Sequence, residues 1–202
     1  MRLPGDQIVA LLVAISFAAG LNVYATVATL GLLGHYDLVT LPQQLHLLTS
    51  WWVIGASSAL FGVGFFADKI PGFDLVWNTL HTFIRVPVAA LLAWRATSNL
   101  SPGEQLAATF LGGVVALVAH SGKTAAHAAV TPSPEPLSNA GLSMGSDVLS
   151  ISLTWLATKH PIVAGAIALA LILVIILFIR WVWKSLRNLL TRAGHLLQFG
   201  TG

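Results

Sequence analysis

The chain has 202 residues, of which 56% are apolar and only 8% are charged, with a net charge of +3. A soluble domain carries about a quarter charged residues, so this composition and a mean hydropathy of +0.82 indicate a protein whose surface faces lipid. These values exclude a cytosolic enzyme and a disordered tail, and the absence of cysteine excludes a secreted disulfide scaffold.

The predicted fold is all-α: a polytopic helical membrane protein with about six transmembrane helices, each needing about 20 apolar residues. The first apolar run covers residues 8–33. It continues well past a candidate signal-peptide cleavage site at residues 16–18, which favours a retained helix over a cleaved signal. At about 1.5 Å per residue the run is longer than the hydrocarbon core, so it is predicted to be tilted, or broken at Gly20.

The remaining spans are predicted at residues 51–67, 75–94, 106–130, 143–158 and 161–183, so that residues 1–183 form a single transmembrane domain. Three prolines between positions 131 and 136 exclude regular helix there, and Pro71-Gly72 predicts a broken or re-entrant segment. A turn at residues 99–103 divides six helices into two groups of three. Because three is odd, the halves would have opposite topology, as in transporters with a 3+3 inverted repeat. The alternative is that any six-helix protein divides by two.

Residues 184–202 are predicted to form a basic amphipathic cytoplasmic tail suited to an anionic membrane surface. The stretch from residue 180 onward holds four of the ten Lys and Arg residues, namely Arg180, Lys184, Arg187 and Arg192. The positive-inside rule therefore places the C-terminus in the cytoplasm and, with Arg2 also inside, the N-terminus too. We expect a multi-pass protein of the cell (inner) membrane whose partners are lipids, with anionic headgroups at the tail. No nucleic-acid partner is expected, and a homo-oligomer is compatible with the sequence.

The first candidate site is a group of charged residues between positions 68 and 85. Asp74, His81 and Arg85 recur at helical spacing and therefore share one face. Ionisable groups at membrane depth are costly, so they persist mainly where they function or lock a fold. His81 and Arg85 lie deep in the apolar run and favour a functional site, whereas Asp68 and Lys69 are better explained as residues at the cytoplasmic interface that cap helix ends.

The second candidate site comprises His120, Lys123 and His127, which share a helix face by their steps of three and four residues. Lys123 would pair with a carboxylate of the first group or with Asp147, and the two groups would then build a charged cavity that opens to the cytoplasm. The alternative is an interfacial lysine without a partner. No metal or cofactor is expected, because no cysteine and few carboxylates lie near these histidines.

Several motifs of the sequence together resemble a known family. They are Gly20-Leu21-Asn22-Val23-Tyr24, Asp68-Lys69-Ile70-Pro71-Gly72-Phe73-Asp74, Thr82-Phe83-Ile84-Arg85 with Pro87, His120-Ser121-Gly122-Lys123, and Ser138-Asn139 with Ser146-Asp147. The resemblance is to an uncharacterised family of multi-pass membrane proteins from bacteria and plastids, a domain of unknown function numbered four-one-two-six, and it covers the chain up to about residue 183. It implies a compact helical membrane protein with these charged loops as its signature, and it brings no established activity.

The leading functional hypothesis is a small-solute or ion transporter or channel whose charged cavity opens to the cytoplasm. The predicted substrate-binding residues are Asp68, Lys69, Asp74, His81, Arg85, His120, Lys123 and Asp147. Arg85 and Lys123 would hold an anion, and the carboxylates would gate the route or relay protons. One alternative is a structural or assembly membrane protein, in which these charges only lock helices together. A weaker one is a membrane enzyme acting on lipid headgroups, for which no catalytic residue is assigned.

Overall fold

The computed structural model describes residues 4–67, 73–130 and 136–199, with side chains left out at 73–79, 130, 136–139, 185–186 and 188–199. The elements follow in chain order: α1 (Gly5–His35), the 3-10 helix η1 (Gln43–Thr49), α2 (Trp51–Ala67), α3 (Phe73–Ala96), α4 (Pro102–Val130), α5 (Pro136–Lys159) and α6 (Pro161–Phe199). These ranges contain helices and no strand, so the predicted all-α fold is confirmed.

Local sequence signals explain where several helices begin. α4, α5 and α6 each start at a proline, namely Pro102, Pro136 and Pro161. Proline suits the first helical position because its missing N–H has no partner there in any case. Before α4, Ser101 and Glu104 form a capping box, in which the Ser101 N–H donates to Glu104 Oε2 over 3.0 Å. Since α5 begins at Pro136, it starts earlier than residue 143, where its start was predicted.

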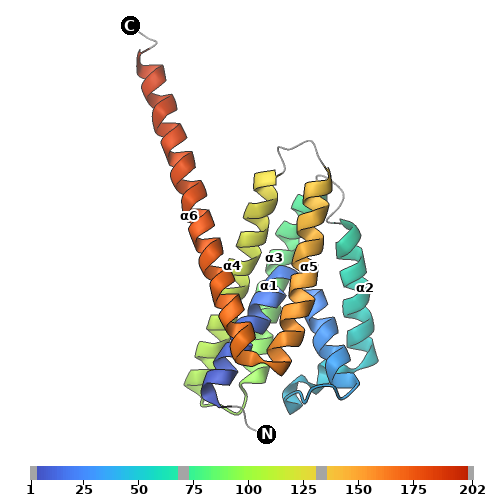
Figure 1. Ribbon diagram of the computed structural model, residues 1–202. Helices are drawn as coiled ribbons and strands as arrows, with labels where there is room; N and C mark the ends of the chain where they lie inside the picture. The colour runs from blue at the N-terminus through green and yellow to red at the C-terminus, as the bar shows by residue number, and fades with distance from the viewer. Residues whose placement is uncertain (1–3, 68–72, 131–135, 200–202) are drawn as a thin grey trace.

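α1 is broken at Asn22, whose backbone angles (φ −150°, ψ 100°) are not helical. Figure 1 shows that the two parts of α1 run in opposite directions, so both ends of α1 lie at the same end of the bundle and the break lies inside it. Residues 5–35 therefore form a re-entrant hairpin. The predicted break exists but lies at Asn22 instead of Gly20, and the crossing of the membrane by residues 8–33 stays a prediction.

Packing against α3 agrees with this hairpin. Leu12, in the first part of α1, shares a buried cluster with Ala93 of α3. Leu30, in the second part, shares a buried cluster with Leu92, the neighbour of Ala93. Residues 18 positions apart in one straight helix would be about 27 Å apart, so they could not both reach the same turn of α3. The chain must reverse between them.

The hairpin is the centre of the molecule. α1 contacts all the other helices, and α2 to α6 run alternately up and down around it (Figure 1). Its buried face is rich in alanine and glycine, which let neighbouring backbones approach closely. A Cβ on Gly20, for example, would lie 2.7 Å from Ala116 Cα of α4. Small side chains thus allow both parts of the hairpin to fit inside a bundle of five helices.

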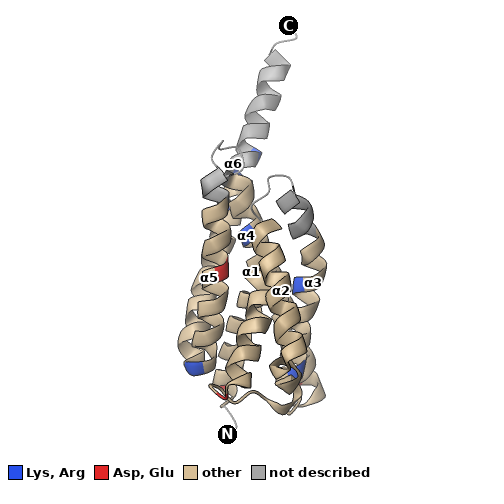
Figure 2. Ribbon diagram, turned by 90° about the vertical axis from the view of Figure 1, so that its right-hand side faces the viewer, with Lys and Arg blue, Asp and Glu red and all other residues tan. Residues whose placement is uncertain are grey.

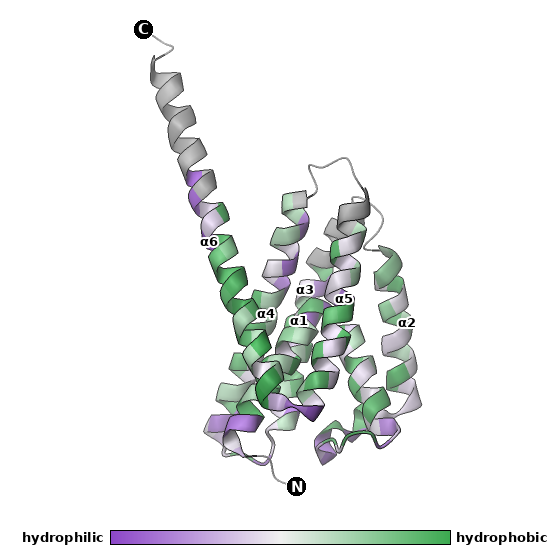
Figure 3. Cartoon of the chain, viewed as in Figure 1, coloured by the Kyte–Doolittle hydropathy of each residue, from purple (hydrophilic) through white to green (hydrophobic). Residues whose placement is uncertain are grey.

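The outer faces of the bundle are apolar, as expected for a membrane protein. By length and composition alone, α1, α4 and α6 qualify among the described residues as candidate membrane spans, although α1 is broken at Asn22. The pair η1 and α2, bent by 62°, would raise the number of candidates to four. On α6 the side chains of Leu173, Val174 and Leu177 are each more than half exposed. Figure 3 shows the lower part of this helix as continuously hydrophobic. Six crossings and an inverted repeat stay predictions.

The two termini lie at opposite ends of the bundle (Figure 1). The hairpin returns the chain to the end where it started, and the five helices that follow then carry it to the other end. Two termini on one side of the membrane would need an even number of crossings, and the prediction that both are cytoplasmic stays a prediction. α6 continues as one helix to Phe199, without a break where the tail was predicted to begin at residue 184.

Candidate functional site

Five of the eight predicted site residues have described side chains, and all five are buried. His81 and Arg85 lie on α3, His120 and Lys123 on α4, and Asp147 on α5, each at most 6% exposed. Figure 2 shows charged residues near both ends of the bundle and a few deep within it. The remaining three predicted residues cannot be placed: Asp68 and Lys69 lie outside the described residues, and Asp74 lies in α3 with its side chain outside the description.

One part of the site joins α3 to α4 through His120. Arg85 Nη1 lies 2.9 Å from His120 Nδ1, and Thr82 Oγ1 contacts the other ring nitrogen. A guanidinium group has no lone pair to accept a hydrogen bond, so it must donate to Nδ1. His120 is therefore the neutral tautomer with its proton on Nε2, which donates to the Thr82 hydroxyl. A buried arginine thus fixes both the position and the protonation of the histidine.

The other part of the site joins the break in α1 to α5. Asn22 Nδ2 donates to Asp147 Oδ1 over 2.8 Å, and Asn22 Oδ1 accepts the N–H of Ala25 over 3.0 Å. Asn22 is therefore the N-cap of the second part of α1, the position that asparagine prefers. The buried Ser150 hydroxyl lies 2.9 Å from the carbonyl oxygen of Ala18, and so reaches the end of the first part. α5 supplies the polar groups that a broken helix needs.

The two parts of the site meet at the tip of the hairpin, where α1 is broken. Tyr24, two residues after the break, packs edge-on against His81, with ring centroids 5.5 Å apart. His81 and Arg85 are one turn apart on α3, and His120 is one turn from Ala116, against which Gly20 packs. Polar side chains from α1, α3, α4 and α5 therefore surround one position inside the bundle. We call this group the tip cluster: Asn22, Tyr24, His81, Thr82, Arg85, His120, Lys123, Asp147 and Ser150.

A comparison with family models identifies the family. The model described as a domain of unknown function, DUF4126, matches residues 9–181. The chain belongs to this family. No curated protein and no solved structure matches it. The match includes every member of the tip cluster in this DUF4126 protein, and the resemblance seen in the sequence motifs is confirmed at the level of the family.

Sequence reasoning missed the residues of this DUF4126 protein that support the break. Asn22 belonged to a quoted motif but had no assigned role, and Ser150 was not singled out. The available signal was an apolar helix pattern interrupted by polar side chains that can cap a helix or bond to backbone: Thr26 Oγ1, for example, donates to the Asn22 carbonyl oxygen over 3.0 Å. His127, predicted to share the face of His120 and Lys123, is buried with them at 7% exposure.

Two cavities lie outside the tip cluster. They have volumes of about 640 and 270 Å³ and lie between α4 and α6, and no predicted site residue lines either one. The predicted open charged cavity stays a prediction. Within the described part of the chain, no three His, Cys, Asp or Glu side chains gather into a group that would hold a metal ion.

Proposed function

We propose that this DUF4126 protein is a membrane transporter or channel for a small anion, with the tip cluster as its route. The observation that carries the proposal is the burial of Arg85, Lys123 and Asp147, together with His81 and His120, inside a bundle whose outer faces are apolar. Ionisable groups at membrane depth are costly and mark ion and substrate pathways in membrane proteins.

The re-entrant hairpin supports the same proposal. Non-helical backbone at membrane depth is tolerated where it is buried in protein or lines a pathway. Here the break places the end of one helix segment and the start of another beside Asp147 and His81. In transporters with discontinuous helices, such half-helix ends form the sites for substrates and coupling ions near the middle of the bilayer.

Each residue has a chemical role in this proposal. Arg85 and Lys123 provide fixed positive charge for an anion, and Arg85 holds His120 as a neutral hydrogen-bond partner. His81, one turn from Arg85 and in edge-on contact with Tyr24, adds a polar group beside the break in α1. Asp147, held by Asn22, would limit the affinity for the anion so that it can leave.

We also infer that the end of the bundle reached by α6 faces the cytoplasm. α6 carries Arg180, Lys184 and Arg187 and contains no Asp or Glu, so the positive-inside rule assigns its end to the cytoplasmic side. Lys123 lies in the half of α4 nearer to that end, so the route would open to the cytoplasm there. The opposite end would hold the N-terminus and the connection around η1.

A structural or assembly role is the second candidate. The Asn22–Asp147 and Arg85–His120 hydrogen bonds each join two helices, which is what a set of fold-locking charges would do. Under this candidate the buried polar groups confer a unique packing and no ion moves. The two candidates differ in whether ion flux exists at all.

The test is ion flux in liposomes containing the purified full chain. Chloride, nitrate and proton movement are followed with entrapped dyes, for the wild type and for Arg85→Gln and Lys123→Gln. The matched control is Arg95→Gln, which removes an exposed arginine at the end of α3. We expect flux in the wild type and control, and loss of flux in both variants at unchanged amounts of folded protein.

Absence of flux above empty liposomes for every ion would favour the structural candidate. The same holds if Arg85→Gln and Lys123→Gln transport as fast as the wild type. If a glutamine variant does not fold, Arg85→Lys keeps the charge while losing the planar donor to His120, and a changed rate in that variant tests the route.

A further inference from the structure

α4 and α6 cross closely at one point and separate beyond it. A Cβ on Gly122 of α4 would lie 2.6 to 2.8 Å from three atoms of the Ile175 side chain on α6, so the helices touch there. Towards the C-terminal end α6 diverges from α4 (Figure 1). The cavity of about 640 Å³ lies in the resulting space, and the cavity of about 270 Å³ shares Ile179 and Arg180 with it. We call this space the α4–α6 groove.

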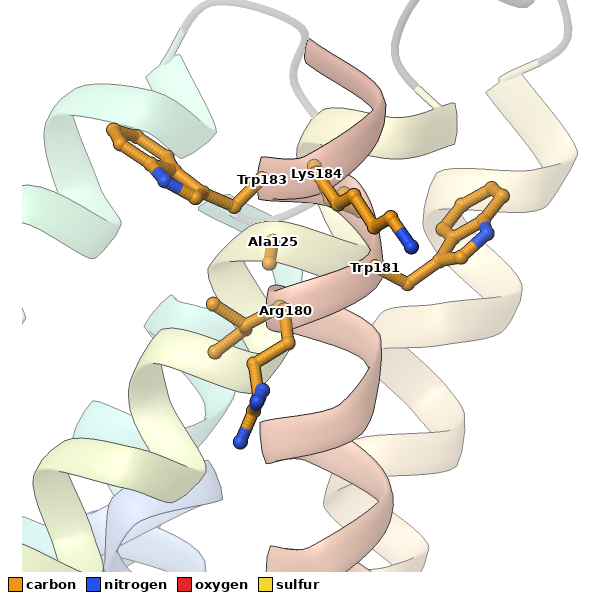
Figure 4. A pocket seen from close by; sticks show the side chains of 7 residues that line it. Ala125, Arg180, Trp181, Trp183 and Lys184 are labelled. Atoms are coloured by element: carbon orange, nitrogen blue, oxygen red, sulfur yellow. The ribbon is translucent and has the colours of Figure 1, made fainter. Parts of the chain in front are cut away.

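The lining of the α4–α6 groove combines apolar and basic groups. Ala125, Ile179 and Val182 are apolar, and Trp181 and Trp183 are 65% and 70% exposed. Figure 4 shows that the two tryptophans extend to opposite sides of α6 and that Arg180 points along the space between the helices. Tryptophans in such a position are typical of the headgroup level of a membrane.

The basic residues of the groove make no ion pair with the acidic side chains that the structure describes. Arg180 and Lys184 lie one turn apart on α6, and α6 contains no Asp or Glu. Neither side chain makes an ion pair with any part of the chain that the structure describes. Two exposed cations beside an apolar groove at the headgroup level are complementary to a phosphate that is attached to a hydrocarbon chain.

We propose that the α4–α6 groove binds one anionic phospholipid of the leaflet at the C-terminal end of the bundle. Arg180 and Lys184 bind the phosphate, and an acyl chain lies along Leu117, Val118 and Ile176 below it. The volumes suit such an occupant, because binding sites for small molecules typically hold about 300–1,000 Å³. This site is separate from the tip cluster and does not depend on ion transport.

The test is lipid binding by the purified full chain, resolved by native mass spectrometry. The protein is titrated with phosphatidylglycerol or with phosphatidylcholine of the same acyl chains. We expect one phosphatidylglycerol to bind more tightly than phosphatidylcholine. Arg180→Gln/Lys184→Gln should bind phosphatidylglycerol about 30-fold more weakly, and each single variant about 5-fold more weakly, because each surface cation contributes independently.

The matched control is Arg95→Gln/Lys159→Gln, which removes two exposed cations at the other end of the bundle. It should keep the wild-type affinity. Equal binding of the two lipids by the wild type would overturn the proposal, and so would an equal loss in the control. A dimer of the wild type that excludes lipid from the groove would assign the surface to a second copy of the chain instead. Since both groove cations are exposed, the variants should fold, and their thermal unfolding midpoints verify this.

Discussion

Replacing Ser150 by alanine removes the hydroxyl that connects both parts of the broken helix α1 to α5. Its Oγ lies 2.9 Å from the Ala18 carbonyl oxygen and 3.1 Å from the Asn22 carbonyl oxygen. Ala18 belongs to the last turn of the first helical part, whose carbonyls have no intrahelical donor. Because Ser150 is fully buried, water cannot take the place of the lost hydroxyl.

Two free energies distinguish between two roles of the Ser150 hydroxyl. An interhelical hydrogen bond in a membrane protein contributes about 0.6 kcal/mol on average. A buried acceptor that is left without a partner costs about 1–3 kcal/mol. If Ser150 satisfies the Ala18 carbonyl at the break, Ser150→Ala should lower the free energy of unfolding by more than about 1 kcal/mol. If the bond is an ordinary contact between helices, the loss should be nearer 0.6 kcal/mol.

The measurement is reversible unfolding in mixed micelles by titration with sodium dodecyl sulfate, followed by tryptophan fluorescence. Ser152→Ala is the control, because Ser152 lies on the same helix and is exposed. Its effect should stay within about 0.5 kcal/mol. An equal effect of the two substitutions would refute the role of Ser150 in holding the break, and the hairpin would then depend on Asn22 and on packing alone.

Three further substitutions test the hairpin and a helix start by the same titration. Asn22→Ala loses both an N-cap and a hydrogen bond to a carboxylate of α5, so it should destabilise by about 2–4 kcal/mol; a loss below 1 kcal/mol would contradict both roles. Gly20→Ala should destabilise by about 1–3 kcal/mol because its Cβ meets the backbone of α4, whereas Gly55→Ala, with open space around it, should be neutral or stabilising by up to about 1 kcal/mol. Equal effects of the two would refute close packing at Gly20. Ser101→Ala removes the capping box of α4 and should cost about 1 kcal/mol; no change would show that the start of α4 needs no cap.

The sequence predicted correctly those features that depend on local spacing. His120, Lys123 and His127 were expected on one helix face, and all three are buried. His81 and Arg85, one turn apart, were expected deep in the protein, and they are. Helical spacing fixes which side chains share a face, so one helix at a time can be predicted without knowing its neighbours.

The features that were missed depend on contacts between distant residues. The partner of Asn22 is 125 residues away in the sequence, and no local pattern points from one to the other. An apolar run of this length has the composition of a crossing helix whether or not it reverses. Asn22 can cap a second helix segment, yet position 25, where a capping box would have Glu or Gln, is Ala25, so the start of that segment carries no strong signal.

The hairpin changes which side of the membrane each connection faces, and this can be measured directly. A single crossing over residues 8–33 would place positions 6 and 38 on opposite sides, whereas a re-entrant hairpin places them on the same side and position 184 on the other. The chain has no cysteine, so Asp6→Cys, Leu38→Cys and Lys184→Cys each provide one exposed thiol without further changes. A membrane-impermeant maleimide added to intact cells should label the first two and leave the third unlabelled until the membrane is opened. Labelling of only one of positions 6 and 38 would refute the hairpin. Labelling of position 184 alone would keep the hairpin and reverse the orientation inferred from the basic end of α6.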